Sequence, residues 1–162
     1  MLRQTVIELY KEQHEFSAGH FTIFSATERE DLHGHNYSVS LSLQVLSGEK
    51  GLEFDYRVYK KKLQAICQTL NRRFLLPSLS PYLKLEEIDD MWIAYFSDEK
   101  IPFLKRDVLI LPIHNVTLEE LSHWFLKEML NDLSELKKQG IQKIGVKVFN
   151  GPGHSGEAVR EL

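Results

Sequence analysis

The feature that most constrains the fold is a strict alternation of apolar and polar residues between positions 35 and 47. Apolar side chains occupy every second position, with polar ones, mostly serine, between them: Tyr37, Val39, Leu41, Leu43 and Val45 alternate with Asn36, Ser38, Ser40, Ser42 and Gln44. Successive side chains of a β-strand point to opposite faces of a sheet, so this pattern predicts a strand. One face of the strand is expected to be buried and the other to be polar.

Two helices are expected. The first follows Asp55, which can cap its N-terminus, and ends near Arg72. The second begins at about Thr117, where Thr117 and Glu120 have the spacing of a capping box, and continues to Gly140 as its C-terminal stop. Apolar residues recur at roughly helical spacing in both segments, which predicts one buried face for each helix.

Strands are expected over the other apolar segments: residues 5–20 as one long strand or a bent pair, three short strands at 83–88, 91–96 and 108–113, and a last strand at 141–149. Residues 21–32 are expected to form a polar loop, and residues 151–162 a loop without a defined place. No repeat, low-complexity tract or linker divides the chain. The sequence therefore predicts one α+β domain over residues 1–162 with a mainly antiparallel sheet.

Charge and composition exclude several classes of function. The 20 Lys and Arg residues are outnumbered by 23 Asp and Glu residues, so no strong basic field attracts nucleic acid. The longest apolar runs, such as residues 108–113, are far shorter than the roughly 20 residues that cross a membrane. We therefore expect a cytoplasmic protein without nucleic-acid or membrane partners. The single cysteine, Cys67, lies in an apolar helical stretch and is expected to be a core residue.

The sequence His33-Gly34-His35 indicates a metal site. Residues two apart on an extended strand project from the same face, with Cα atoms roughly 6.6 Å apart, so two imidazoles can converge on one ion. His20 is the obvious third ligand, and three neutral nitrogens suit zinc with a position left for water or substrate. Gly34 allows a close approach or an unusual backbone angle. The alternative is a pair of half-exposed strand histidines with ordinary hydrogen-bond partners.

Four motifs occur in an order and spacing that cover most of the chain: Phe16-Ser17-Ala18-Gly19-His20, Leu32-His33-Gly34-His35-Asn36-Tyr37, Phe54-Asp55-Tyr56 and Asn115-Val116-Thr117-Leu118-Glu119. Together they resemble the 6-pyruvoyl-tetrahydropterin synthase and 6-carboxytetrahydropterin synthase family. The resemblance implies the tunnelling fold, in which an antiparallel four-stranded sheet carries two helices on one side. It also implies trimers that close into a barrel, two trimers stacked as a homo-hexamer, and zinc held by His20, His33 and His35.

Members of this family act on dihydroneopterin triphosphate. The resemblance therefore implies a zinc-dependent lyase with a pterin pocket between subunits, in folate, biopterin or queuosine synthesis. Glu30 is the candidate base, because Glu30-Asp31-Leu32-His33 matches a variant branch in which Glu replaces the family's catalytic Cys. We expect partial burial near zinc to move the pKa of Glu30 towards neutrality. The alternative is one more charge on a solvated loop.

Substitutions occur at other functional positions of the family. Where the family has Asp and His, this chain has Asn71, which cannot titrate, and Arg72, which stays protonated and is expected to bind an anion or stabilise negative charge. Asn150 stands where the family has the Glu that clamps the pterin. Thr117 and Glu119 match substrate-pocket positions of the family, although both also suit a helix start.

Two hypotheses follow. The first is a lyase of the 6-pyruvoyl or 6-carboxytetrahydropterin synthase type with a non-standard proton relay, in which Glu157 is a candidate substitute for the missing clamp. The second is a divergent member that keeps the fold and zinc but binds or transforms another small molecule. Loss of the family's Cys, Asp, His and clamp Glu favours the second hypothesis. Retention of three histidine ligands with an open fourth position favours the first.

Overall fold

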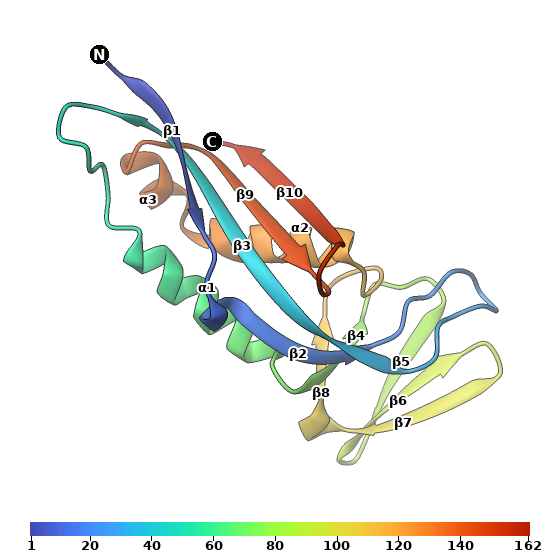
Figure 1. Ribbon diagram of the computed structural model, residues 1–162. Coiled ribbons are helices and arrows are strands. Elements are labelled where there is room, and N and C mark those ends of the chain that lie inside the picture. The colour runs from blue at the N-terminus through green and yellow to red at the C-terminus, as the bar shows by residue number, and fades with distance from the viewer.

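The computed structural model describes all 162 residues, and its main element is a seven-stranded sheet. Four antiparallel rows make up most of this sheet (Figure 1). β1 (Arg3–Leu9) and β2 (Glu15–His20) share the first row, because both pair with β3 (His33–Ser47), and β3 is followed by β9 (Ile141–Phe149) and β10 (Ser155–Glu161). Two parallel strands extend the sheet beyond β2: β4 (Arg73–Pro77) and β8 (Val108–Leu111). The expected antiparallel four-stranded sheet is confirmed, and the two parallel strands extend it.

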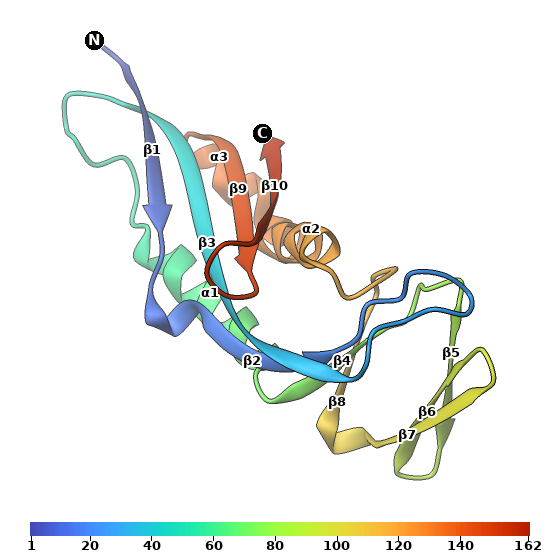
Figure 2. The same ribbon diagram turned by 45° about the vertical axis from the view of Figure 1, so that its right-hand side comes forward.

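The alternating segment forms the long central strand β3. Val39, Leu41 and Leu43 are fully buried, whereas the serines between them are partly exposed. Burial of each such side chain contributes about 1.5–3 kcal/mol. Helices α1 (Arg57–Leu70) and α2 (Leu118–Met129) cover the apolar face of the sheet, and the main core lies between the helices and the sheet (Figure 2). The predicted α+β architecture with two helices on one side is confirmed.

The first helix lies close to its predicted position. It begins at Arg57, whose backbone N–H donates to the Asp55 carboxylate at 3.0 Å, and it ends at Leu70, near the expected Arg72. Arg72 itself adopts a left-handed conformation, with a φ of 61°, and its N–H donates to the carbonyl oxygen of Ser17 at 2.7 Å. This bond ties the turn after α1 to β2.

The predicted second helix is two helices. α2 ends at Met129, and a 3₁₀ turn leads to α3 (Leu133–Lys138), which begins after Asp132. The Asp132 carboxylate accepts the N–H of Glu135 at 3.2 Å, and a side chain that caps a new first turn interrupts the helix there. Gly140, with a φ of 74°, follows α3 and stops the helical segment as predicted.

The predicted capping box of α2 is half formed. Thr117 Oγ1 accepts the N–H of Glu120 at 3.3 Å, as expected. The Glu120 carboxylate, however, accepts the N–H of His114 at 2.6 Å rather than that of Thr117. The Glu120 side chain therefore holds the segment that leads into the helix.

Residues 5–20 form the bent pair rather than one long strand. A 3₁₀ turn (Glu12–His14) separates β1 from β2, and both strands pair with β3. His14, in this turn, is 1 % exposed because the turn packs against α1 and β3. The prediction of a loop at residues 151–162 is wrong, because β10 pairs antiparallel with β9 and buries Ala158.

Residues 83–104 form a second, three-stranded sheet in the order β5 (Leu83–Ile88), β6 (Met91–Phe96) and β7 (Glu99–Leu104). β5 and β6 were predicted, but β7 and β4 were not, and the predicted strand at 108–113 ends at Leu111. A small apolar cluster packs this sheet against the main body: Phe21, Ile23, Leu76, Leu83, Ala94, Phe96 and Val108. The second sheet therefore lies against the connection between β2 and β3 (Figure 1).

Cys67 is fully buried on α1, and burial raises the pKa of its thiol to about 12, so it is a core residue as predicted. None of the helices combines the length and the apolar character needed to cross a membrane.

Candidate functional site

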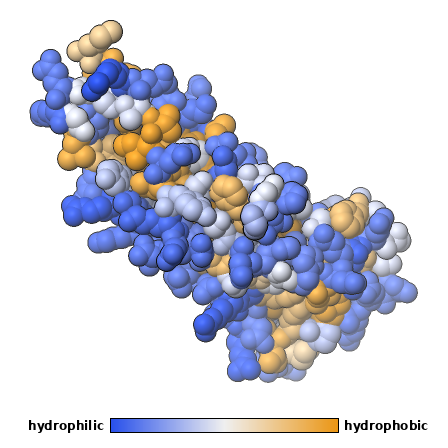
Figure 3. All heavy atoms as spheres, viewed as in Figure 1, coloured by the Kyte–Doolittle hydropathy of each residue, from blue (hydrophilic) through white to orange (hydrophobic).

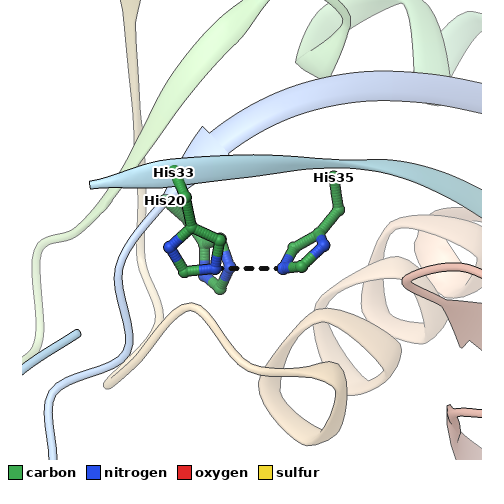
Figure 4. Close-up of side chains that lie close together, drawn as sticks. All are labelled: His20, His33 and His35. Carbon is green, nitrogen blue, oxygen red and sulfur yellow. Dashed lines mark hydrogen bonds between the residues drawn. The ribbon is translucent and has the colours of Figure 1, made fainter. Parts of the chain in front are cut away.

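Strand register brings three histidines together. In the antiparallel pairing of β2 with β3, His20 lies opposite His33, and Ala18 lies opposite His35. The three imidazoles share one face of the strands, and their ligand nitrogens all lie within 4.8 Å of one another (Figure 4). His20 is buried, His35 is partly exposed and His33 is exposed. The cluster is therefore the product of ladder pairing and of the two-residue period of a strand.

Backbone carbonyl groups orient two of the rings. His20 Nδ1 lies 2.9 Å from the carbonyl oxygen of Val116, and His33 Nδ1 lies 2.7 Å from that of Asp31. A carbonyl oxygen only accepts hydrogen bonds, so in the neutral rings both Nδ1 atoms carry the proton and both Nε2 atoms present a lone pair to the cluster. His20 Nε2 is buried without a hydrogen-bond partner, and His33 Nε2 lies 3.1 Å from His35 Nε2. A bound cation would satisfy this arrangement of acceptors.

This donor set fits zinc. Burial lowers the pKa of His20, and the Val116 carbonyl, which opposes this, does not cancel it. Burial also lowers the pKa of His35. Both rings are therefore neutral at neutral pH and available as ligands. His20, His33 and His35 would hold the ion, and three protein ligands are typical of catalytic zinc sites.

Close approach of the two strands depends on Gly34, as predicted. A Cβ atom at this position would lie 2.8 Å from the carbonyl oxygen of Ala18 and 3.4 Å from its carbonyl carbon. Both are backbone atoms of β2, so they cannot move away without shifting the ladder that sets the histidines. Glycine therefore fits where a larger residue would push β2 and β3 apart.

Glu30 lies beside the histidines. Its Oε2 atom accepts the N–H of Thr22 at 2.9 Å and lies 3.7 Å from His33 Nε2. Burial raises the pKa of this carboxyl, but the hydrogen bonds from Thr22 and the nearby His20 and His33 lower it more, so the pKa lies below its ordinary value. The expected shift towards neutrality is therefore wrong, because hydrogen bonding to the charged form outweighs partial burial. Glu30 is ionised at neutral pH and can accept a proton.

A cavity of about 300 Å³ opens beside the cluster. Most of the site residues named from the sequence line it: His20, His35, Glu30, Thr117, Glu119 and Asn150. Thr117 and Glu119 come from the start of α2, and Asn150 follows the end of β9. Segments from three parts of the chain thus meet around the histidines.

Arg72 lies elsewhere. It lines a second, open cavity of about 460 Å³ together with Ser17 and Asn36, and His35 is the one residue of the cluster that lines both cavities. Strand alternation places the side chains of Ser17 and Asn36 on the face of β2 and β3 opposite to the histidines. Glu157 also lies away from the site, because its neighbour Ala158 faces the core and Glu157 is exposed on the other face of β10.

Sequence reasoning missed two residues of the site region. Tyr37 lines the cavity, and burial raises its pKa, so its phenol stays neutral. Its position two residues after His35, on the same face of β3, is a signal that could have identified it. Asn115 accepts the N–H of Ile23 at 3.1 Å and donates to its carbonyl oxygen at 2.8 Å. No local pattern indicates this contact, which joins residues 92 positions apart.

Known proteins share both the sequence pattern and the fold. The pattern of 6-pyruvoyl tetrahydropterin synthase matches residues 8–161, which is nearly the whole chain. The chain belongs to this family. A relative from Methanocaldococcus jannaschii, provisionally described as a 6-carboxy-5,6,7,8-tetrahydropterin synthase, is 28% identical over 142 residues, covering 85% of each chain.

Solved structures of the family superpose closely on this one. The 6-pyruvoyl tetrahydropterin synthase of Plasmodium vivax is 29% identical, with a TM-score of 0.93 over 99% of both chains. A variant of that enzyme, in which a glutamate described as a catalytic residue is replaced by alanine, gives 28% identity and the same TM-score of 0.93 over 99% of both chains. Family membership and fold are thus confirmed, and at this coarse level the protein is a tetrahydropterin synthase of the lyase class.

Proposed function

We propose that this protein is a zinc-dependent lyase that acts on dihydroneopterin triphosphate. The observation that carries the proposal is the convergence of three histidine ligand atoms with an ionised carboxylate, Glu30, beside one cavity. A Lewis acid next to a base suits a reaction that moves protons along a hydroxylated side chain.

Glu30 is the proposed base. Zinc, when bound, supplies a Lewis acid that polarises an oxygen of the substrate side chain. The Glu30 carboxylate accepts a proton from a side-chain carbon, and the electron pair of that C–H bond expels triphosphate from the neighbouring carbon. The P. vivax enzyme uses a glutamate described as catalytic, which supports this assignment.

Glu119 and Asn150 are proposed to bind the pterin ring. Both line the cavity, and the Glu119 carboxylate can accept two hydrogen bonds from the guanidine-like edge of a pterin. Asn150 can accept one bond and donate another, which makes it a weaker clamp than the family's Glu. Thr117 lines the same cavity, and its Oγ1 accepts the N–H of Glu120.

Arg72 is proposed to act on the site of a neighbouring subunit, because it does not line the Glu30 cavity of its own chain.

Three exposed apolar side chains lie on the outer face of the main sheet: Val6, Leu46 and Val159. Figure 3 shows apolar residues gathered over this part of the molecule. Together with the outer edges of β1 and β10, they support assembly of the sheet into the barrel of a homo-hexamer built from two trimers.

A second candidate is a divergent member that binds or transforms another small molecule. Asn150 favours it, because the amide lines the cavity where the family's carboxylate would grip the pterin. Under this alternative the zinc site is kept and the pterin is not.

Product analysis tests the proposal. Zinc-loaded protein is incubated with dihydroneopterin triphosphate, and the products are identified by mass spectrometry beside a Glu30→Gln variant. We expect a zinc-dependent pterin product, and we expect Glu30→Gln to lose about 10²–10⁴-fold in rate while retaining zinc. No product from the zinc-loaded oligomer would reject the lyase and favour the second candidate.

A further inference from the structure

Arg29 directly precedes the proposed base, Glu30, and its guanidinium group donates hydrogen bonds to two residues. Nε and Nη2 donate to the two carboxylate oxygens of Glu99, at 3.1 and 2.6 Å, and Nη1 donates to the carbonyl oxygen of Glu30 at 2.7 Å. The Arg29 side chain is only 14 % exposed. A planar guanidinium can bind both oxygens of a carboxylate and a further acceptor at once, because its donors are fixed in a fork.

Two aromatic rings enclose the same guanidinium. Arg29 Cζ lies 5.3 Å from the ring centroid of Phe21 and 5.9 Å from that of Phe96. Both rings are 1 % exposed. Phe21 directly follows β2, whereas Phe96 ends β6 and Glu99 begins β7. Arg29 therefore joins the connection that carries Glu30 to the three-stranded sheet.

Glu30 is held through its backbone and its side chain. Its N–H donates to the carbonyl oxygen of Thr22 at 2.9 Å, its own carbonyl accepts Arg29, and its carboxylate accepts the Thr22 N–H at 2.9 Å. These contacts fix the carboxylate at the position 3.7 Å from His33 Nε2. A misplacement of about 1 Å in a catalytic group can cost about 10²-fold in rate.

We propose that Arg29 and Glu99 are positioning residues for Glu30, and that the sheet of β5, β6 and β7 is the anchor through which they act. The proposal rests on the proposed function, in which Glu30 is the base. Neither Arg29 nor Glu99 lines the cavity, so both act through Glu30 and not on the substrate. Residues 70 positions apart thereby set the geometry of the base.

A matched control pair is present on the same sheet. Lys105 Nζ lies 2.5 Å from Glu87 Oε1, and neither residue lines the cavity. This pair joins β5 to the residue that follows β7 and has no contact with the Glu30 segment. If Arg29 and Glu99 served only to stabilise the sheet, the two pairs would behave alike in catalysis.

The first test compares Arg29→Met, Arg29→Lys, Glu99→Gln and Lys105→Met in the zinc-loaded full chain, with dihydroneopterin triphosphate as substrate. We expect Arg29→Met to lower kcat about 10–100-fold with KM and bound zinc unchanged. Glu99→Gln should lower kcat less, and Lys105→Met should leave it unchanged. Arg29→Lys should recover stability but not kcat, because an ammonium paired with Glu99 cannot also reach the Glu30 carbonyl in the same geometry.

The second test needs no turnover. Hydrogen exchange of the Thr22 and Glu30 amides reports the two bonds that hold the base. We expect protection of both amides to fall at least about tenfold in Arg29→Met and Glu99→Gln, and to persist in Lys105→Met.

Unchanged kcat or unchanged protection in Arg29→Met would overturn the proposal, and so would a loss of zinc, which would indicate collapse of the whole site. If Arg29→Met fails to fold, Glu99→Gln and Arg29→Lys decide the same question. Absence of turnover in the wild-type chain would reject the proposed function alone, since the exchange measurement still decides whether Arg29 holds Glu30.

Discussion

The two halves of the candidate site are held in different ways. The three histidines project from β2 and β3, and one antiparallel ladder sets their spacing. Glu30 lies in the connection between those strands, where no ladder of the main sheet holds it. Its position depends on Arg29 and Thr22, and on Asn115, which holds the same connection from 92 residues away.

This difference predicts that zinc binding and turnover are separable in this chain. The spacing of a cluster built by strand register depends mainly on the two strands, and the carbonyl groups of Asp31 and Val116 add only the orientation of two rings. A carboxylate held by tertiary contacts can be misplaced by substitutions far from the metal. Phe96→Ala, Gly34→Ala and Asn115→Ala are each expected to disturb one half and to leave the other in place.

The largest effect is expected from Phe96→Ala, which disturbs the anchor of Glu30. Phe96 is 1 % exposed in the small core under the three-stranded sheet. Removal of a buried Phe side chain costs about 3–5 kcal/mol, which is enough to loosen this sheet while the main core persists. We expect a lower kcat, weaker protection of the Thr22 amide against hydrogen exchange, and one zinc ion still bound at each three-histidine site. Urea unfolding, hydrogen exchange and zinc analysis measure these three quantities.

Ile88→Ala is the control for this substitution. Ile88 ends β5 and is 39% exposed, so its truncation should change stability far less. If Phe96→Ala released zinc, the two halves would not be independent and the comparison would fail.

Gly34→Ala disturbs the metal half. Its Cβ would lie 2.8 Å from the Ala18 carbonyl oxygen, so β3 must move away from β2 between the two strand histidines. We expect a loss of about 1–3 kcal/mol in stability, typical of overpacking, together with weaker zinc binding. Thermal unfolding and titration with zinc check both effects.

Gly48→Ala provides the matched glycine control. A Cβ at Gly48 meets its nearest atom at 3.7 Å, so neither stability nor zinc affinity should change much. Tight zinc binding by Gly34→Ala would show that ladder spacing does not determine the metal site.

The same contrast explains how much of the site could be predicted from sequence. His33 and His35 are two residues apart and therefore share one face of a strand. Pairing with the preceding strand brings His20 to them, so the two-residue period of a strand was sufficient to predict the cluster. Arg29 and Glu99 are 70 residues apart, and each resembles an ordinary surface charge. The pKa of Glu30 was wrongly expected to shift towards neutrality because its hydrogen bond from Thr22 follows from the loop's fold and not from the residue's neighbours.

The fold shows the same limit. β3 was predicted because its buried and exposed residues alternate strictly, whereas β10 buries Ala158 alone among mostly exposed positions. β7 contains Pro102, which argues against a strand unless the strand lies at a sheet edge, and β7 is the edge of its sheet. Tertiary pairing, not local pattern, defines both elements.

Asn115→Ala is expected to have an intermediate effect on the Glu30 half. The Asn115 side chain accepts the N–H groups of Ile23 and Val116 and donates to the Ile23 carbonyl. Loss of these part-buried bonds should cost about 1–2 kcal/mol and lower kcat with zinc retained. Asn115→Asp keeps the acceptor and loses the donor, so it should be less damaging. Equal kcat in wild type and Asn115→Ala would show that the connection is held without this residue.

The smallest effect concerns a second buried histidine near β2. His14 and His20 each have a buried ring nitrogen without a hydrogen-bond partner, but His14 belongs to no cluster of ligands. Burial lowers the pKa of His14, the Lys60 backbone opposes this, and the charges of Lys11 and Lys60 lower the pKa further. The folded-state pKa therefore lies below the value of about 6.5 of the unfolded chain.

Protonation of His14 consequently favours unfolding. Its stabilising contribution is complete above about pH 6.5 and is lost as the pH falls from there through the folded-state pKa, with each pKa unit of difference between the two states corresponding to about 1.4 kcal/mol. In zinc-loaded protein, His14→Leu should flatten the pH dependence of the free energy of unfolding between about pH 7 and 5, measured by urea titration. The proposed zinc ligands are common to both proteins, so the difference in slope isolates His14. An unchanged slope would contradict the lowered pKa, and loss of zinc would show that the turn before β2 helps to set the metal half.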